Sequence, residues 1–182
     1  MKKFICLLIF FISFNINSQD TYLQCGKIID TERGKVLNKK TIIVSSDKIV
    51  AIKNGFVSSD NPLDKVIDLK SKTVMPGLID LHVHIESEFN PQKYMNAFTA
   101  NDADIAFGSL KFAEITLMAG FTTVRDLGGT GINISLRDAI AKGEVVGPRI
   151  FTAGKAIGTT GGHADPTNGW KNSLRGDPGP KE

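Results

Sequence analysis

The stretch that decides the fold of this chain is VMPGLIDLHVH, residues 74–84. It has the pattern of an apolar β-strand that ends in polar side chains. Because successive side chains on a strand point to opposite faces, Asp80, His82 and His84 share one face. Two imidazoles therefore converge at the carboxyl end of the strand, which is where parallel α/β folds build their binding sites.

A bare His-x-His pair is weak support for a metal site. Surface histidines, or core histidines with satisfied hydrogen bonds, are the commoner explanation of such a pair. If His82 and His84 do bind a metal, zinc suits neutral imidazole nitrogen, and two ligands leave manganese, cobalt and iron open. The surrounding sequence must decide between these interpretations.

Downstream of the pair, apolar strands alternate with helices. We expect strands at 74–83, 121–127 and 149–156 and helices at 106–119 and 134–142. Continuously apolar strands that alternate with helices indicate a parallel sheet buried on both faces. Three such strand–helix starts open either a doubly wound sheet or a barrel, and the local pattern does not separate the two.

Upstream of the pair, residues 20–73 form a different pattern. Short apolar runs alternate with segments rich in Gly, Ser, Asp, Asn and Pro, which favour turns. The runs lie at 26–30, 41–44, 48–52 and 66–69. This pattern predicts a small antiparallel β domain ahead of the parallel sheet.

Residues 1–19 have the order of an export signal. Lys2 and Lys3 precede an apolar run from Phe4 to Phe14, and a polar stretch follows. The run is shorter than the roughly 20 residues that span a bilayer. We therefore exclude this signal peptide from the fold and expect a secreted protein, periplasmic or extracellular, with no membrane span. A buried N-terminal helix or a retained anchor is the alternative.

Charge and cysteine content argue against a nucleic-acid-binding protein and against a protein stabilised by an internal disulfide. Removal of residues 1–19 takes away two of the 22 basic residues and none of the 19 acidic ones, so the mature chain is almost neutral and no nucleic-acid partner is implied. Cys6 lies in the signal, which leaves Cys25 without a partner for an internal disulfide. A small buried thiol is favoured there over a reactive one.

The arrangement around residues 74–84 resembles the amidohydrolase superfamily, in which a (β/α)8 TIM-like barrel carries one or two metal ions and a β-sandwich flanks the barrel. Two later stretches extend the resemblance: residues 119–126 are similar to the second barrel strand, and residues 159–165 to the loop after the third. The set is similar to imidazolonepropionase and Xaa-Pro dipeptidase-like members. The resemblance implies the first three βα units of the barrel at 74–182, after a small β-sandwich-type domain.

The resemblance also implies roles for individual residues. His82 and His84 would bind a divalent metal, zinc foremost, as one or two ions, and His163 would contact substrate. The alternative for His163 is a solvated loop histidine. Arg125 and Asp126 either orient the site or form an ordinary ion pair. The resemblance places the general base and the remaining ligands on later strands, so it implies no catalytic residue in this chain.

The function implied is metal-dependent hydrolysis of C–N bonds in an amide, a peptide or a cyclic amide. A metal-bound hydroxide attacks the carbonyl carbon in such enzymes. We expect a dipeptide or another small molecule as substrate, an N-terminal fragment that is inactive alone, and a protein that can form oligomers. A non-catalytic metal- or ligand-binding module and a short two-domain protein are the alternatives.

Overall fold

The computed structural model describes residues 19–165, 167–171 and 174. The expected export segment lies outside this part of the chain, except for its last residue, Gln19. The chain separates into two compact units. The first, here called the β unit, ends at Pro76, and the second, the α/β unit, begins at Gly77. The expected boundary, between residues 73 and 74, lies three residues earlier.

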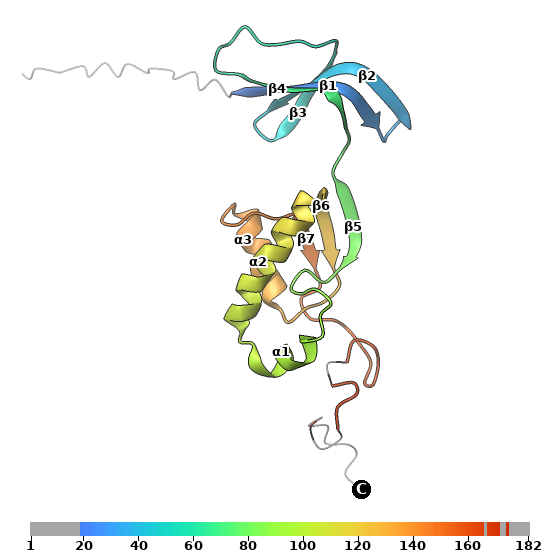
Figure 1. The fold of residues 1–182 in the computed structure, drawn as a ribbon, viewed down its shortest axis with the longest axis vertical. Helices are drawn as coiled ribbons and strands as arrows, with labels where there is room; N and C mark the ends of the chain where they lie inside the picture. The colour runs from blue at the N-terminus through green and yellow to red at the C-terminus, as the bar shows by residue number, and fades with distance from the viewer. Residues whose placement is uncertain (1–18, 166, 172–173, 175–182) are drawn as a thin grey trace, which may run out of the picture. The chain divides into compact units, whose positions relative to one another are not determined.

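The β unit is one twisted sheet (Figure 1). Its four strands are β1 (Asp20–Asp30), β2 (Lys35–Ser45), β3 (Lys48–Asn54) and β4 (Lys65–Val74), in the spatial order β3-β2-β1-β4. β1 and β3 are antiparallel to β2, but β4 is parallel to β1. The prediction of an all-antiparallel domain is therefore wrong for β4. The physical reason is the connection at residues 55–64, which takes the chain from one edge of the sheet to the other.

Two buried polar side chains hold this connection against the sheet. The Thr41 hydroxyl donates to the Gly55 carbonyl at 2.8 Å and accepts from the Val57 amide at 3.0 Å. The Gln24 amide donates to the Val57 carbonyl at 3.1 Å. Beneath them lies an apolar cluster that includes the fully buried Cys25.

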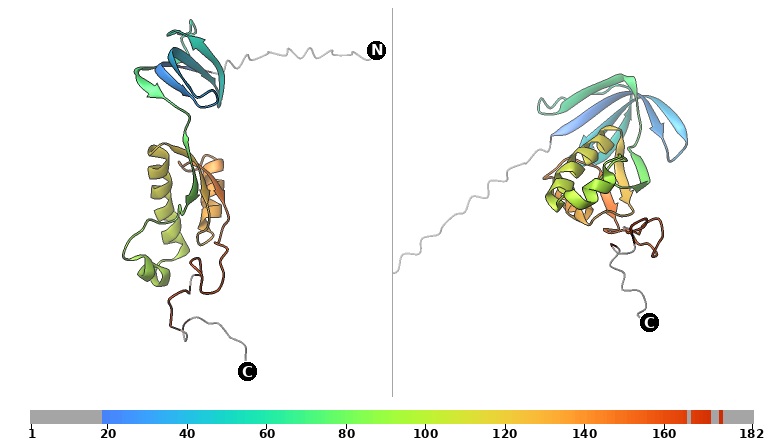
Figure 2. Two further views of the ribbon diagram at one scale, coloured as in Figure 1. Left: turned by 90° about the vertical axis from the view of Figure 1, so that its right-hand side faces the viewer. Right: turned by 60° about the horizontal axis from the view of Figure 1, so that its bottom comes forward.

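The α/β unit contains three parallel strands in the order β5-β6-β7. Figure 2 shows α2 running alongside these strands. The elements are β5 (Leu78–Val83), α1 (Lys93–Thr99), α2 (Asp102–Met118), β6 (Phe121–Asp126), α3 (Ile132–Ala141) and β7 (Arg149–Thr152). The predicted parallel pairing and the alternation of strands with helices are confirmed. No helix within the described residues combines the length and apolar character needed to cross a membrane.

Two of the strands expected downstream of residue 73 differ from the prediction by four residues at one end. The expected strand 74–83 is interrupted, since Val74 ends β4 and β5 begins only after Pro76 and Gly77. A Cβ at Gly77 would lie 2.0 Å from the Thr122 hydroxyl oxygen, so the backbone needs glycine to pass this point. β7 ends at Thr152, four residues before the expected end. Its hydroxyl accepts the amide of Gly154, which has a positive φ of 74°.

The helices differ in two ways. α2 begins at Asp102, four residues before the expected start, because the Asp104 carboxylate accepts the Asn101 amide at 2.9 Å. α1, Lys93–Thr99, was not expected at all.

The core of the α/β unit lies on one face of its sheet. Val124 and Ile150 pack there against Ala113 of α2 and Leu136 of α3. Phe151, whose side chain alternates with that of Ile150, is 59% exposed. The expectation of burial on both faces is therefore wrong for the described residues, because α2 and α3 both cover the same face.

Candidate metal centre

The two predicted metal ligands lie together at the end of β5. The ring centroids of His82 and His84 are 5.5 Å apart, and the ring planes meet at 74°. Both side chains are exposed. The third polar residue of this face, Asp80, turns back to accept the His82 backbone amide at 2.9 Å. Two accessible, neighbouring imidazoles form a donor set that fits a divalent transition metal.

The hydrogen bond of His84 determines which of its ring nitrogens carries a proton. Nδ1 lies 2.7 Å from the carbonyl oxygen of Gly128. A carbonyl oxygen can only accept, so Nδ1 must donate and hold the proton. In the neutral ring, Nε2 is then left with its lone pair. Metal-binding histidines commonly make this contact, because it fixes both tautomer and orientation.

Asp126, at the end of β6, lies behind this contact. Its side chain is fully buried. One carboxyl oxygen accepts the Ile85 amide at 3.1 Å and the other accepts the Gly128 amide at 2.9 Å. Arg125 points elsewhere and donates to the Leu81 carbonyl at 2.8 Å. The alternative of an ion pair between Arg125 and Asp126 is therefore wrong: the ion pairs found in the described part of the chain do not include one.

A second buried carboxyl group belongs to Glu86, which the sequence analysis missed. Glu86 is 8% exposed. Its two oxygens accept the amides of Thr130 and Asn133, at 2.6 and 2.7 Å, at the start of α3. A Cβ on Gly129 would lie 2.5 Å from the carboxyl carbon of Glu86, so the chain passes close by. The Gly128-Gly129 pair was the one available signal, since adjacent glycines often mark a close backbone approach.

Asn133 extends the network to the loop after β7. Its side chain is fully buried, and Nδ2 donates to the Gly154 carbonyl at 2.9 Å. The Gly129 amide donates to the same carbonyl at 2.8 Å. Oδ1 of Asn133 is buried without a hydrogen-bond partner among the described atoms. Hydrogen bonds thus tie together the loops that follow all three parallel strands.

His163, the predicted substrate-contacting residue, lies apart from this network. It is exposed in a turn of the loop after β7, where the Asp165 carboxylate accepts the Gly161 amide at 2.6 Å. In the described part of the chain, neither a hydrogen bond nor a ring contact joins it to His82 or His84. Nor do the described residues contain a group of three or more His, Cys, Asp or Glu side chains placed to hold a metal.

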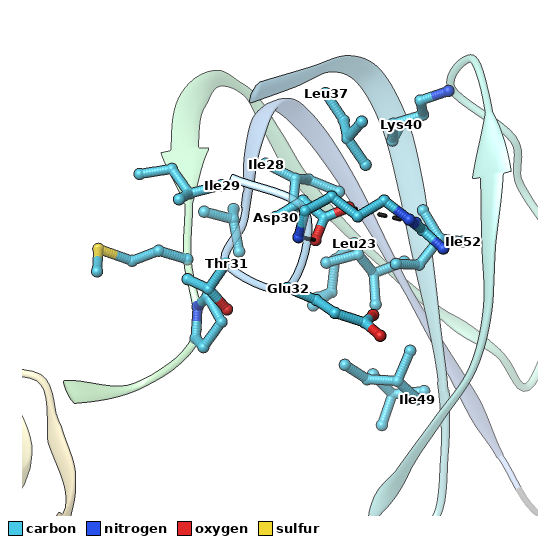
Figure 3. A pocket seen from close by; sticks show the side chains of 16 residues that line it. Leu23, Ile28, Ile29, Asp30, Thr31, Glu32, Leu37, Lys40, Ile49 and Ile52 are labelled. Carbon is cyan, nitrogen blue, oxygen red and sulfur yellow. Dashed lines mark hydrogen bonds and ion pairs between the residues drawn. The ribbon is translucent and has the colours of Figure 1, made fainter. Parts of the chain in front are cut away.

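Two cavities, one in each unit, differ in chemistry. A cavity of about 500 Å³ lies beside Glu86 and is also lined by Glu88, Asn90 and Asp104. A larger one, of about 680 Å³, lies in the β unit (Figure 3). Apolar side chains of the sheet dominate its lining, among them Leu23, Ile28, Ile42, Val44, Ile49 and Ile52. Asp30 and Glu32 also line this cavity, but neither His82 nor His84 does, so volume alone does not locate the candidate metal site.

Comparison with known proteins identifies the family of the chain. The model of the amidohydrolase family matches residues 73–178. A solved structure of a Xaa-Pro dipeptidase with methionine in its active site is 42% identical, with a TM-score of 0.77 over 85% of this chain. A prolidase complexed with N-methylphosphonate-L-proline is 41% identical, with a TM-score of 0.68 over 80% of this chain.

A curated relative has a different activity. A 5-methylthioadenosine/S-adenosylhomocysteine deaminase of Bacillus cereus is 38% identical over 65 residues, which are 36% of this chain and 15% of that protein. Ochratoxinase of A. niger, at 24% identity and a TM-score of 0.62, shows likeness of fold alone. The chain spans 38% of the dipeptidase and 34% of the prolidase. These amidohydrolase neighbours imply a TIM-barrel-like fold.

Proposed function

Because the chain belongs to the amidohydrolase family, we propose that the whole protein is a metal-dependent hydrolase of C–N bonds, with a dipeptide that ends in proline as its substrate. The observation that carries this proposal is the accessible pair of imidazoles at the end of β5, with the His84 tautomer set by the Gly128 carbonyl. The likeness to a Xaa-Pro dipeptidase and a prolidase supports the substrate class.

His82 and His84 would hold the metal, for which zinc is the first choice, as one or two ions. The metal, when bound, lowers the pKa of a water molecule and polarises the scissile carbonyl. The chain's own contribution is to present Nε2 of His84 without a proton and to keep both rings accessible. Catalytic zinc sites use three protein ligands, so two imidazoles need at least one more. We propose that other strands of the whole protein supply it and that residues 1–182 alone are inactive.

Three further assignments belong to the same proposal. The α/β unit is the first three βα units of a (β/α)8 barrel, and the β unit is part of a composite β-sandwich. His163 contacts substrate from the loop after β7. The protein is exported, to the periplasm or the outside of the cell.

The test compares metal content and turnover in the full-length protein. We expect zinc to co-purify, to be measurable by plasma mass spectrometry, and to be lost in His82→Ala and His84→Ala. His163→Ala is the matched control: it should keep the metal but raise the KM for a panel of Xaa-Pro dipeptides. A wild-type protein that binds zinc but hydrolyses none of the panel would contradict the peptidase assignment and favour a non-catalytic binding module.

Deamination is the second candidate function, favoured by the 38% identity to the Bacillus cereus deaminase. The two activities are separated by one assay series on the same preparation. Release of ammonia from 5-methylthioadenosine or S-adenosylhomocysteine, with no release of proline from dipeptides, would favour deamination. We expect the opposite result, because the dipeptidase and the prolidase align with 85% and 80% of this chain at more than 40% identity, whereas the deaminase aligns with 36% of it.

A further inference from the structure

Both side-chain hydrogen bonds of Asp126 in this region are with backbone amides, and they connect it to His84. Both of its carboxyl oxygens are occupied by backbone amides, and the side chain is fully buried. One of those amides belongs to Ile85, the residue after His84. The other belongs to Gly128, whose carbonyl oxygen contacts Nδ1 of His84. Asp126 therefore holds the backbone on both sides of the imidazole.

We propose that Asp126 is a positioning residue for His84. By fixing the Ile85 and Gly128 peptides, it presents the Gly128 carbonyl to Nδ1, keeps the proton on that nitrogen and leaves Nε2 as the nitrogen that can bind a metal. The consequence for metal affinity rests on the proposed function; the consequence for the tautomer does not.

The local backbone explains why a side chain is needed here. The parallel pairing of β5 with β6 shifts register between Asp80 and Val83, and its last pair is Val83 with Asp126. His84 and Ile85 follow this last pair, so they lack the backbone ladder that orients residues within a strand. The Asp126 carboxyl group supplies the missing hydrogen bond to Ile85.

The Gly128 peptide is confined from its other side as well. Gly128 has a φ of 152°, and a Cβ there would lie 2.5 Å from the Cβ of Ala156. The peptide is thus packed against the loop after β7 while its amide is held by Asp126. Its carbonyl oxygen has little freedom to leave Nδ1 of His84 unless the Asp126 contact is lost.

Asp126→Asn in the full chain is the decisive variant. An Asn of the same shape keeps one acceptor but turns an amide N–H₂ toward the other backbone N–H, so one of the two contacts must break. In metal-free protein, ¹⁵N–¹H correlation of the imidazoles should show wild-type His84 with its proton on Nδ1 and the variant as a mixture of tautomers. The signal is assigned by its loss in His84→Gln. Zinc affinity should fall about 10- to 100-fold.

Asp138→Asn is the matched control, since it makes the same chemical change at an exposed carboxylate that pairs with Arg137. It should leave both the tautomer and the zinc affinity as in the wild type. A backbone ¹⁵N–¹H spectrum like that of the wild type shows that Asp126→Asn is folded, and in a folded variant a mixture of His84 tautomers reports lost positioning and not unfolding.

Three results would overturn the proposal. The first is an unchanged His84 tautomer in Asp126→Asn, and the second is an unchanged zinc affinity in that variant when the wild type binds zinc through His84. The third result concerns the wild type and applies if Asp126→Asn does not fold. It is an Nδ1 proton of His84 that exchanges rapidly and shows no coupling to the Gly128 carbonyl. A wild type that binds no zinc contradicts the proposed function only, and the tautomer measurement still tests the positioning.

Discussion

The two units of the chain bury different kinds of polar group. In the β unit, Gln24 and Thr41 are buried, and both are uncharged side chains that hold one connection against the sheet. In the α/β unit, the carboxyl groups of Glu86 and Asp126 are buried, together with Asn133, at the carboxyl ends of the parallel strands. Each of these two carboxyl groups accepts two backbone amides.

The comparison shows where the structure buries ionisable groups, at a cost in free energy, in order to fix a specific geometry. Burying an ionisable group costs more than burying a neutral one unless it is fully hydrogen-bonded. A neutral Thr or Gln is sufficient to hold a loop, as the β unit demonstrates. Two carboxyl groups at the strand ends therefore suggest a tighter geometric requirement there. Substitutions in the β unit should change stability alone, whereas those at the strand ends should change metal binding as well.

The largest effect is expected from Glu86→Ala. The variant leaves the amides of Thr130 and Asn133 without their acceptor. Asn133 is buried, and a buried donor left unsatisfied costs about 1–3 kcal/mol, whereas Thr130 is exposed and its amide costs less. We expect a loss of roughly 2–4 kcal/mol in the free energy of unfolding, and zinc affinity lower by about tenfold or more. Urea unfolding and zinc titration measure the two. Glu88→Ala, at an exposed neighbour, should change neither. Unchanged zinc binding in folded Glu86→Ala would contradict the expectation that substitutions at the strand ends change metal binding as well as stability.

Gly129→Ala tests the same contact from the opposite side. The new Cβ would meet the Glu86 carboxyl group at 2.5–2.6 Å, so either the loop or the carboxyl group must move. Overpacking of this kind costs about 1–3 kcal/mol, and we expect the upper half of that range because the contact is buried. Gly108→Ala is the control: its Cβ meets open space in α2, so it should stabilise the protein by about 0.5–1 kcal/mol. Equal melting temperatures for the two variants would show that the close approach is not rigid.

A smaller effect, confined to stability, is expected from Thr41→Val in the β unit. The valine keeps the shape but removes the hydroxyl between the Gly55 carbonyl and the Val57 amide. The free energy of unfolding should fall by about 1–2 kcal/mol, with zinc affinity unchanged. Thr73→Val, at an exposed position of β4, should have little effect on either. A change in zinc affinity in Thr41→Val would contradict the separation of roles between the units.

The sequence predicted those parts of the fold that depend on near neighbours. Periodicity and turn residues located β6 and α3 to within two residues, and strand alternation placed His82 and His84 on one face. The parallel position of β4 was missed because strand pairing joins residues far apart in the chain. Val74 was assigned to the wrong strand because an apolar run continues across Pro76 and Gly77 without a change in pattern.

The contacts that orient the site were beyond local prediction for a related reason. Both amides that Glu86 holds, and one of the two that Asp126 holds, lie more than forty residues away, and an amide has no sequence signature. The pattern therefore identified the two imidazoles but not the carboxyl groups behind them. His163 shows the converse: a motif can single out a residue whose position in the fold then places it in an exposed turn.

The smallest effect concerns Cys25 in the β unit. Its thiol is fully buried, and burial raises its pKa above the ordinary value, partly offset by a hydrogen bond from the Ile42 backbone. The folded state then keeps its proton at a pH where the unfolded state, with a pKa of about 8.5, loses it. The contribution of Cys25 to stability is fully present below the unfolded-state pKa. It falls as the pH rises from the unfolded-state pKa toward the folded-state pKa, by at most about 1.4 kcal/mol per pH unit.

Between pH 8 and 10, the free energy of unfolding should fall more steeply in the wild type than in Cys25→Ala. Parallel slopes would contradict this, and a difference in zinc affinity between the two proteins at pH 7 would break the separation between the units.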